Sequence, residues 1–173
     1  MANTYTLIQA YTLGSDTASV SFTSIPATYT DLQLLLSARI NRTGIAVNMG
    51  LRFNSNSTGY LNLQAYADFT SSTAAALYSS ALDQFGYWYT AGNSATASTF
   101  TNQSVYISDY ASSKHKTISI DSASENNAID ASLLFMSGLW SNTAAITDIT
   151  LTNFQGDNLR ANSTFYLYGI SNS

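Results

Sequence analysis

The sequence predicts an all-β protein, an antiparallel β-sandwich of about ten strands for which a jelly roll is the favoured arrangement. Two observations carry this prediction. Short segments of alternating apolar and polar residues recur at the roughly 8- to 12-residue spacing that is typical of sandwiches and barrels. The composition also disfavours a helical bundle, because only 6 of the 173 residues are Lys or Arg, whereas Ser, Thr and Asn number 26, 21 and 15.

The N-terminal half begins with two predicted strands, at 5–11 and 18–22. The four residues Leu13-Gly14-Ser15-Asp16 between them have the composition of a hairpin turn. The clearest alternation follows at 32–40, where every even position is apolar. This pattern is typical of a strand with one buried face.

The remaining predicted strands are rich in β-branched and aromatic residues, as a half-buried pleated surface favours. They lie at 45–53, 60–66, 100–107, 116–120, 131–140, 146–151 and 164–170. Segments rich in Asn, Gly and Ser connect them. The stretch 71–84 contains Ala74-Ala75-Ala76-Leu77 and fits either a short helix or an irregular strand or loop. No linker composition divides the chain, so we expect one domain over residues 1–173.

The charge pattern disfavours nucleic acid and membrane as partners. The formal net charge is −4 and the six cations are scattered, whereas a nucleic-acid surface needs several cations on one face. The apolar runs are far shorter than the roughly 20 residues that span a bilayer. The first residues, 1–7, lack the features of a secretory signal, so we expect synthesis in a cytoplasm without export by that route.

The scarcity of residues that protect strand edges indicates that this chain assembles with other subunits. Isolated β-proteins protect exposed edges with charged residues, especially Lys, or with Pro. This chain has two lysines and one proline. We therefore expect neighbouring subunits to cover its edges; protection by loops or bulges is the alternative.

No catalytic or metal motif is found, and we expect neither enzymatic activity nor a cofactor. His115 is the only histidine and no cysteine is present, so a His/Cys metal site cannot form. No Gly-x-Ser-x-Gly elbow accompanies His115, no phosphate-binding loop occurs, and a single glutamate marks no catalytic carboxylate pair. An oxygen-ligand calcium site and a plain polar turn are the two readings of Asp121, Glu125, Asn126, Asn127 and Asp130.

Aromatic residues are the candidate binding groups. Tyr87-Trp88-Tyr89 lies in a Gly-flanked segment, and Tyr60 and Tyr66 lie in a predicted strand. Tyrosine suits protein interfaces, and ring faces can also stack on sugars. Because neighbouring strand residues point to opposite faces, we expect Trp88 to be buried and the tyrosines to lie at a surface, contacting a protein partner or a glycan. Core packing is the alternative for each ring.

Several segments resemble a family of small virion structural proteins of tailed bacteriophages, notably marine phages that infect cyanobacteria. The resemblance rests on Phe22-Thr23-Ser24-Ile25-Pro26-Ala27-Thr28-Tyr29-Thr30-Asp31-Leu32, Tyr106-Ile107-Ser108-Asp109-Tyr110, Gly138-Leu139-Trp140-Ser141-Asn142-Thr143 and Leu167-Tyr168-Gly169-Ile170. It extends from residue 5 to 170 and is weakest at 70–98, which looks like a variable, insertion-like region.

The resemblance implies a β-sandwich virion protein without enzymatic activity. A capsid decoration or cement protein on the outer head surface is the favoured role; such proteins are often trimeric and bind the major capsid protein or other virion proteins. The alternative is a tail-fibre or appendage module that binds a host glycan. The motifs transfer no residue-level function.

Overall fold

The computed structural model describes residues 4–68, 73–124 and 132–171. Strands account for all regular secondary structure in this described part. They are β1 (Tyr5–Thr12), β2 (Ser19–Phe22), β3 (Asp31–Ala38), β4 (Ala46–Phe53), β5 (Tyr60–Asp68), β6 (Thr73–Leu82), β7 (Phe85–Ala91), β8 (Thr101–Ile107), β9 (Lys116–Ser124), β10 (Ser132–Trp140), β11 (Ile149–Asn153) and β12 (Thr164–Ile170).

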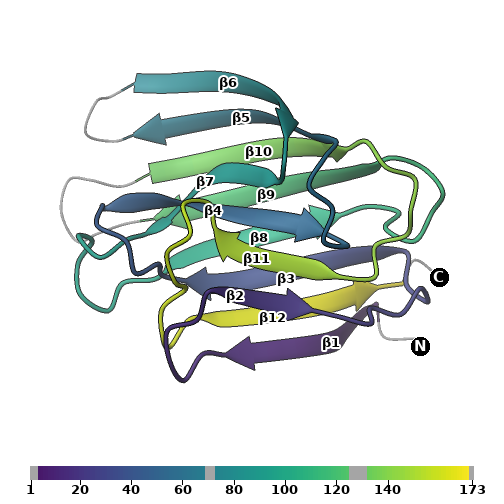
Figure 1. Ribbon diagram of the computed structural model, residues 1–173, viewed down its shortest axis with the longest axis horizontal. Helices are drawn as coiled ribbons and strands as arrows, with labels where there is room; N and C mark the ends of the chain where they lie inside the picture. The colour runs from purple at the N-terminus through teal and green to yellow at the C-terminus, as the bar shows by residue number, and fades with distance from the viewer. Residues whose placement is uncertain (1–3, 69–72, 125–131, 172–173) are drawn as a thin grey trace.

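The strands form two antiparallel sheets that face each other, which confirms the predicted sandwich. The large sheet has eight strands in the order β1-β12-β3-β8-β9-β10-β5-β6, and the small sheet has four in the order β2-β11-β4-β7. In Figure 1 the small sheet lies in front of the large one, and β6 extends past it at the top. The inner face of the large sheet contacts the small sheet as far as β5, whose Asn62 bonds to Gly86 of β7, whereas β6 at the far edge overhangs.

The core fills the space between the sheets with one cluster of buried side chains. At its centre, Phe85 packs edge-on against Tyr60 and Phe53, with ring centroids 4.9 and 5.6 Å apart. Trp88 and Trp140 are also fully buried. Burying large rings in this way contributes most of the favourable free energy of such a core.

Polar side chains on the inner face of the large sheet bind the backbone of β7, the edge strand of the small sheet. Asn62 Nδ2 donates to the Gly86 carbonyl at 3.0 Å. Gln103 Nε2 and Ser122 Oγ both donate to the Tyr89 carbonyl, at 2.9 and 2.7 Å. These bonds satisfy buried polar groups and close an edge that would otherwise recruit another strand.

Two expectations about the N-terminal half and the centre of the chain are corrected. The strands β1 and β2 do not form a hairpin: β1 pairs with β12, and β2 pairs with β11 in the other sheet. The connection crosses between the sheets because backbone bonds from Leu13 to Ser163 and from Thr17 to Leu159 hold it beside the C-terminal segment. The helical alternative for 71–84 is also wrong, since its described residues include β6, which pairs with β5.

Candidate interaction surfaces

Tyr60 does not lie at a surface, contrary to expectation. It is fully buried, with its ring stacked on Trp140 at 6.1 Å. Its hydroxyl accepts a bond from the Phe53 N–H at 2.9 Å and lies within bonding distance of the Asn56 carbonyl. Burial raises the pKa of Tyr60 to about 12. This tyrosine holds the β4–β5 connection against the core and cannot contact an external ligand in this fold.

Trp88 is fully buried, as expected, and Tyr87 and Tyr89 are half-buried on either side of it. The Tyr87 ring packs on Phe154 at 4.7 Å, whereas Tyr89 meets Tyr66 edge-on at 5.9 Å. The structure therefore brings Tyr66 and Tyr89 together, while Tyr87 contacts a different aromatic residue. The four tyrosines do not form one shared platform.

The remaining sequence candidates offer little chemistry. His115 is exposed just before β9. Of the calcium candidates, Asp121 is exposed on β9, and Glu125, Asn126, Asn127 and Asp130 lie outside the described residues. Within the described ranges, no three His, Cys, Asp or Glu side chains gather to hold a metal, and no helix is long and apolar enough to cross a membrane.

The face of the large sheet that points away from the small sheet, here the outer face, carries exposed apolar side chains. Phe135 and Leu63 are 60% and 56% exposed, and Tyr78, Leu35 and Leu133 are also exposed. Directly opposed residues share a face in an antiparallel sheet, so the register gives three rows across six strands. The rows are Leu35-Ser104-Asp121-Phe135-Ala65-Ala76, Ser37-Asn102-Ala123-Leu133-Ala67-Ala74 and Gln33-Tyr106-Ser119-Ser137-Leu63-Tyr78.

The outer face is almost free of charge and is uneven in shape. Asp121 is the only charged side chain in the three rows. Three hollows of about 410, 390 and 430 Å³ meet at Phe135. They arise because Ala65, Ala76 and Ser104 are much smaller than the ring that stands among them. The face thus combines a projecting aromatic ring with adjacent hollows.

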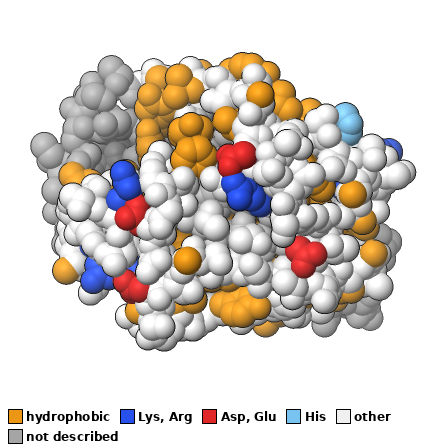
Figure 2. Space-filling model, viewed as in Figure 1, with side chains coloured by type: hydrophobic (Ala, Val, Ile, Leu, Met, Phe, Trp, Pro, Cys, Tyr) orange, Lys and Arg blue, Asp and Glu red, His pale blue; other side chains and the backbone are white. Residues whose placement is uncertain are grey.

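The strand β6 forms one edge of the same sheet. It pairs only with β5, and its segment TAAALYSSAL contains neither a charged residue nor proline. In the view of Figure 2, hydrophobic side chains gather along the top of the molecule, over β5 and β6, while charged side chains are few and scattered. Leu77 on β6 is 48% exposed because its strand extends past the small sheet. Such an edge is open to a further strand or a partner surface.

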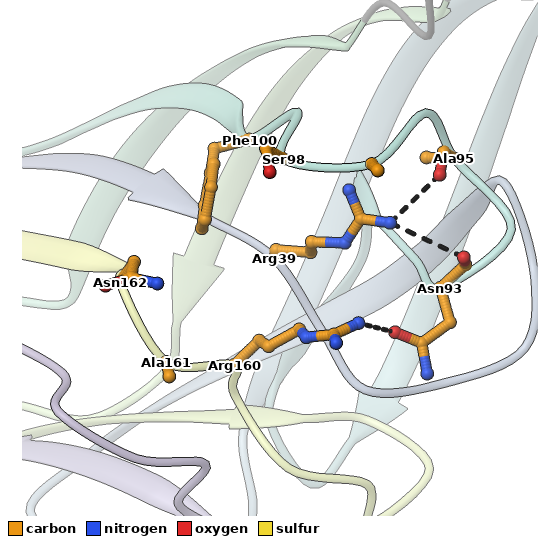
Figure 3. Close-up of a pocket in the computed structure, with 9 residues that line it drawn as sticks. Arg39, Asn93, Ala95, Ser98, Phe100, Arg160, Ala161 and Asn162 are labelled. Carbon is orange, nitrogen blue, oxygen red and sulfur yellow. Dashed lines mark hydrogen bonds between the residues drawn. The ribbon is translucent and has the colours of Figure 1, made fainter.

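A pocket of about 340 Å³ lies at the C-terminal end of β3, between the 92–100 and 160–162 loops (Figure 3). Arg39 follows β3 and is 4% exposed, yet no carboxylate pairs with it in the described structure. Its Nη1 donates to the Thr96 and Thr99 carbonyls at 2.6 and 3.0 Å, and its Nη2 donates to the Ala95 carbonyl at 2.9 Å. Backbone oxygens therefore solvate this buried guanidinium.

Arg160 lies beside Arg39 in the pocket and donates from Nη1 to Asn93 Oδ1. Burial lowers the pKa of Arg39, and the neighbouring positive charge of Arg160 lowers it further. The other two arginines have carboxylate partners, Arg42 with Asp157 and Arg52 with Asp83. The two arginines without an ion pair among the described residues thus share one pocket.

Sequence reasoning missed both Phe135 and this arginine pair. Alternation reveals that β10 has two faces, but it cannot tell which one the small sheet covers when Leu133, Leu134, Phe135 and Met136 are all apolar. Arg39 and Arg160 are 121 positions apart in the sequence, since 160 less 39 is 121. Only the loop-to-loop bonds of the fold bring them together.

Comparison of the chain with protein-family models, with curated proteins and with solved structures gave no match.

Proposed function

We propose that this chain is a structural protein of a bacteriophage virion, a capsid decoration or cement protein on the outer head surface. The observation that carries the proposal is the outer face of the large sheet, where Asp121 is the only charge in the three rows, with Phe135 projecting from its centre and the β6 edge open beside it. A contiguous apolar face of this kind is uncommon on isolated soluble proteins and marks contact with another protein.

The dimensions of the outer face suit a specific interface. Eight strands spaced about 4.8 Å apart span about 34 Å, and seven residues at about 3.3 Å each span about 23 Å. Their product, a planar area on the order of 800 Å², is similar in size to the accessible area that one partner buries in a standard interface. We propose the major capsid protein, or another virion protein bound to it, as the occupant of this face.

The scarcity of charge supports the same role. An interface built on Phe135, Leu63 and small residues depends on burial of apolar area rather than on ion pairs. Copies of this chain then associate with one another around their capsid site, and a trimer is the proposed arrangement. The protein carries out no catalysis in this proposal, and its place is the virion.

The strand order supports a jelly roll as the finer description of the fold. The large sheet contains the order β1-β12-β3-β8, the small sheet has the order β2-β11-β4-β7, and the connections β1–β2, β3–β4, β7–β8 and β11–β12 each cross between the two sheets. An eight-stranded jelly roll has two four-stranded sheets made from two Greek keys. In this description, β5–β6 and β9–β10 are added strand pairs that widen the large sheet, and β6 forms its overhanging edge.

A receptor-binding module that contacts a host glycan is the second candidate. The half-buried pair of Tyr87 and Phe154, with rings 4.7 Å apart, favours it because both rings come from the surface of the small sheet. Loss of glycan binding in Tyr87→Ala would support this role.

Quantitative mass spectrometry of purified particles separates the two roles. The copy number of this chain is measured against that of the major capsid protein in virions of the phage that encodes it. Decoration predicts hundreds of copies per particle, and a receptor-binding role predicts a few or tens. Absence of the chain from purified particles contradicts both.

A further inference from the structure

The pocket between Arg39 and Arg160 carries an unbalanced positive charge. Its lining comprises Arg39, Asn93, Ala95, Ala97, Ser98, Phe100, Arg160, Ala161 and Asn162, none of which is acidic. The carboxylate nearest by hydrogen bonds is that of Asp16, which accepts a bond from Asn41 Nδ2 and the Ala161 N–H. Asn93 connects Asn41, and through it Asp16, to Arg160. Asp16 forms no ion pair with either guanidinium among the described residues.

The guanidinium of Arg39 acts on the pocket through its charge, because its donors are either bonded to the backbone or buried. Its two Nη atoms bond to backbone oxygens of the 93–99 loop, whereas its Nε has no partner and is buried. Arg160 is exposed, and its Nη1 donates to Asn93 Oδ1. The two positive charges line one pocket and repel each other, so an anion bound in that pocket would be stabilised by both.

The rest of the lining includes apolar groups, which a site for an inorganic ion alone would not need. In the view of Figure 3 the Phe100 ring lies between the Arg39 and Asn162 side chains. Ala95, Ala97 and Ala161 add apolar surface. A volume of about 340 Å³ is in the range of small-molecule sites. The ligand that fits this lining has one anionic group, one apolar ring face and several hydroxyls.

Backbone strain coincides with the same walls. Ser98 and Asn162 have positive φ angles of 64° and 70° and line the pocket. Six other described non-glycine residues also have positive φ angles, and asparagine adopts this region more often than most residues do, so the strain at these walls is mainly that of Ser98.

We propose that this pocket binds the carboxylate of an acidic sugar, a hexuronate unit, with Arg160 and Arg39 facing the carboxylate and Phe100 packing on the sugar ring. The amide of Asn162 and the hydroxyl of Ser98 then face the sugar hydroxyls. The site belongs to the isolated chain and does not depend on the proposed role in the capsid.

Titration of the ¹⁵N-labelled chain with glucuronate and galacturonate, followed by NMR, tests the proposal. We expect saturable shifts of the 93–100 and 160–162 amides with at least one uronate, and none with glucose or galactose at the same concentration. Arg160→Gln, a change at an exposed side chain, should weaken uronate binding at least tenfold. Phe100→Ala should weaken it severalfold, whereas Arg42→Gln, at an ion-paired arginine, should leave it unchanged.

Three results overturn the proposal. The first is no saturable binding of either uronate. The second is equal binding of sulfate with no effect of Phe100→Ala, which identifies an anion site without sugar recognition. The third is equally tight binding of an N-acetylglutamate amide with no effect of Phe100→Ala, which identifies a site for a protein carboxylate. A failure of the capsid proposal alone changes none of these outcomes.

Discussion

Phe135 on β10 lies directly opposite Ala65 on β5, so a ring that is 60% exposed stands beside a methyl group on the outer face. The same ring lies opposite Asp121 on its other side. A partner that covers this face can therefore enclose the ring and fill the hollow over Ala65 at the same time. Large rings in such central positions contribute disproportionately to binding free energy.

Phe135→Asp should abolish incorporation into particles without unfolding the chain. The side chain is exposed, but the new carboxylate lies directly opposite Asp121, so we expect a loss of about 1 to 2 kcal/mol in the free energy of unfolding. Burying this second carboxylate beside Asp121 in an interface that is otherwise free of charge should weaken binding by about 2 kcal/mol or more. Particles assembled with the variant are assayed by mass spectrometry. Ile45→Asp, at an exposed apolar residue outside the outer face, is the matched control, and equal incorporation of both variants would count against the interface.

The attachment of the chain to particles should resist salt. Only Asp121 is charged in the three rows of the outer face, and the screening length falls from about 10 Å at 0.1 M to about 3 Å at 1 M salt. Purified particles washed in a series of NaCl concentrations over this range should retain the chain. Release of the chain at modest ionic strength would show that ion pairs hold it instead.

Asn62→Ala should destabilise the fold through β7. The substitution leaves the Gly86 carbonyl without its donor, at a cost of about 1 to 2 kcal/mol. The lower part of this range is expected if removal of the unpartnered Asn62 Oδ1 offsets part of the loss. Urea unfolding measures the change, with Asn102→Ala on the exposed side of β8 as the control that should change stability by about 0.5 kcal/mol or less. Equal effects of the two variants would refute the role of Asn62.

The fold should lose stability between about pH 10 and pH 12. The pKa of Tyr60 is about 12 in the folded chain and ordinarily 10.0, so the folded state retains a proton that the unfolded state releases. The stability from this group is complete below pH 10 and falls as pH rises through 12. Thermal unfolding of Tyr60→Phe should show a smaller decline than the parent chain over this window. An equal decline would assign the effect to other groups, such as Tyr106, whose bond to Asp31 also raises its pKa to about 12.

Alternation was sufficient to predict the sandwich and most of its strands, because a half-buried strand imposes a period of two on its sequence. Alternation did not distinguish a strand from a helix for β6, because its Ala-rich segment has no regular succession of polar and apolar residues. It also misjudged Tyr60, since the alternation in β5 places Asn62 and Gln64 inside with Tyr60, and Leu63 and Ala65 outside. Sequence alone suggests the opposite orientation because it does not show that buried amides bind the edge of β7.

The candidate surfaces could be predicted from the sequence less well than the strands could. The scarcity of Lys and Pro drew attention to strand edges, but only the sheet order and the bonds between the sheets show that β7 is closed by the facing sheet while β6 is open. The exposed face around Phe135 depends on which sheet covers which side of β10. That choice is made by contacts between strands distant in sequence, and no local pattern encodes it.

Site-specific labelling of the outer face tests the central claim most directly. The chain contains no cysteine, so Leu63→Cys gives a single reactive thiol on the outer face, and Thr143→Cys gives one at an exposed loop residue as the control. Maleimide labelling rates are measured for the isolated chain and for intact particles. If the outer face is buried against the capsid, Leu63→Cys reacts readily in the isolated chain and at least tenfold more slowly in particles, while Thr143→Cys changes much less. Equal rates for Leu63→Cys in both states would show that the outer face is free in the virion and would contradict the account.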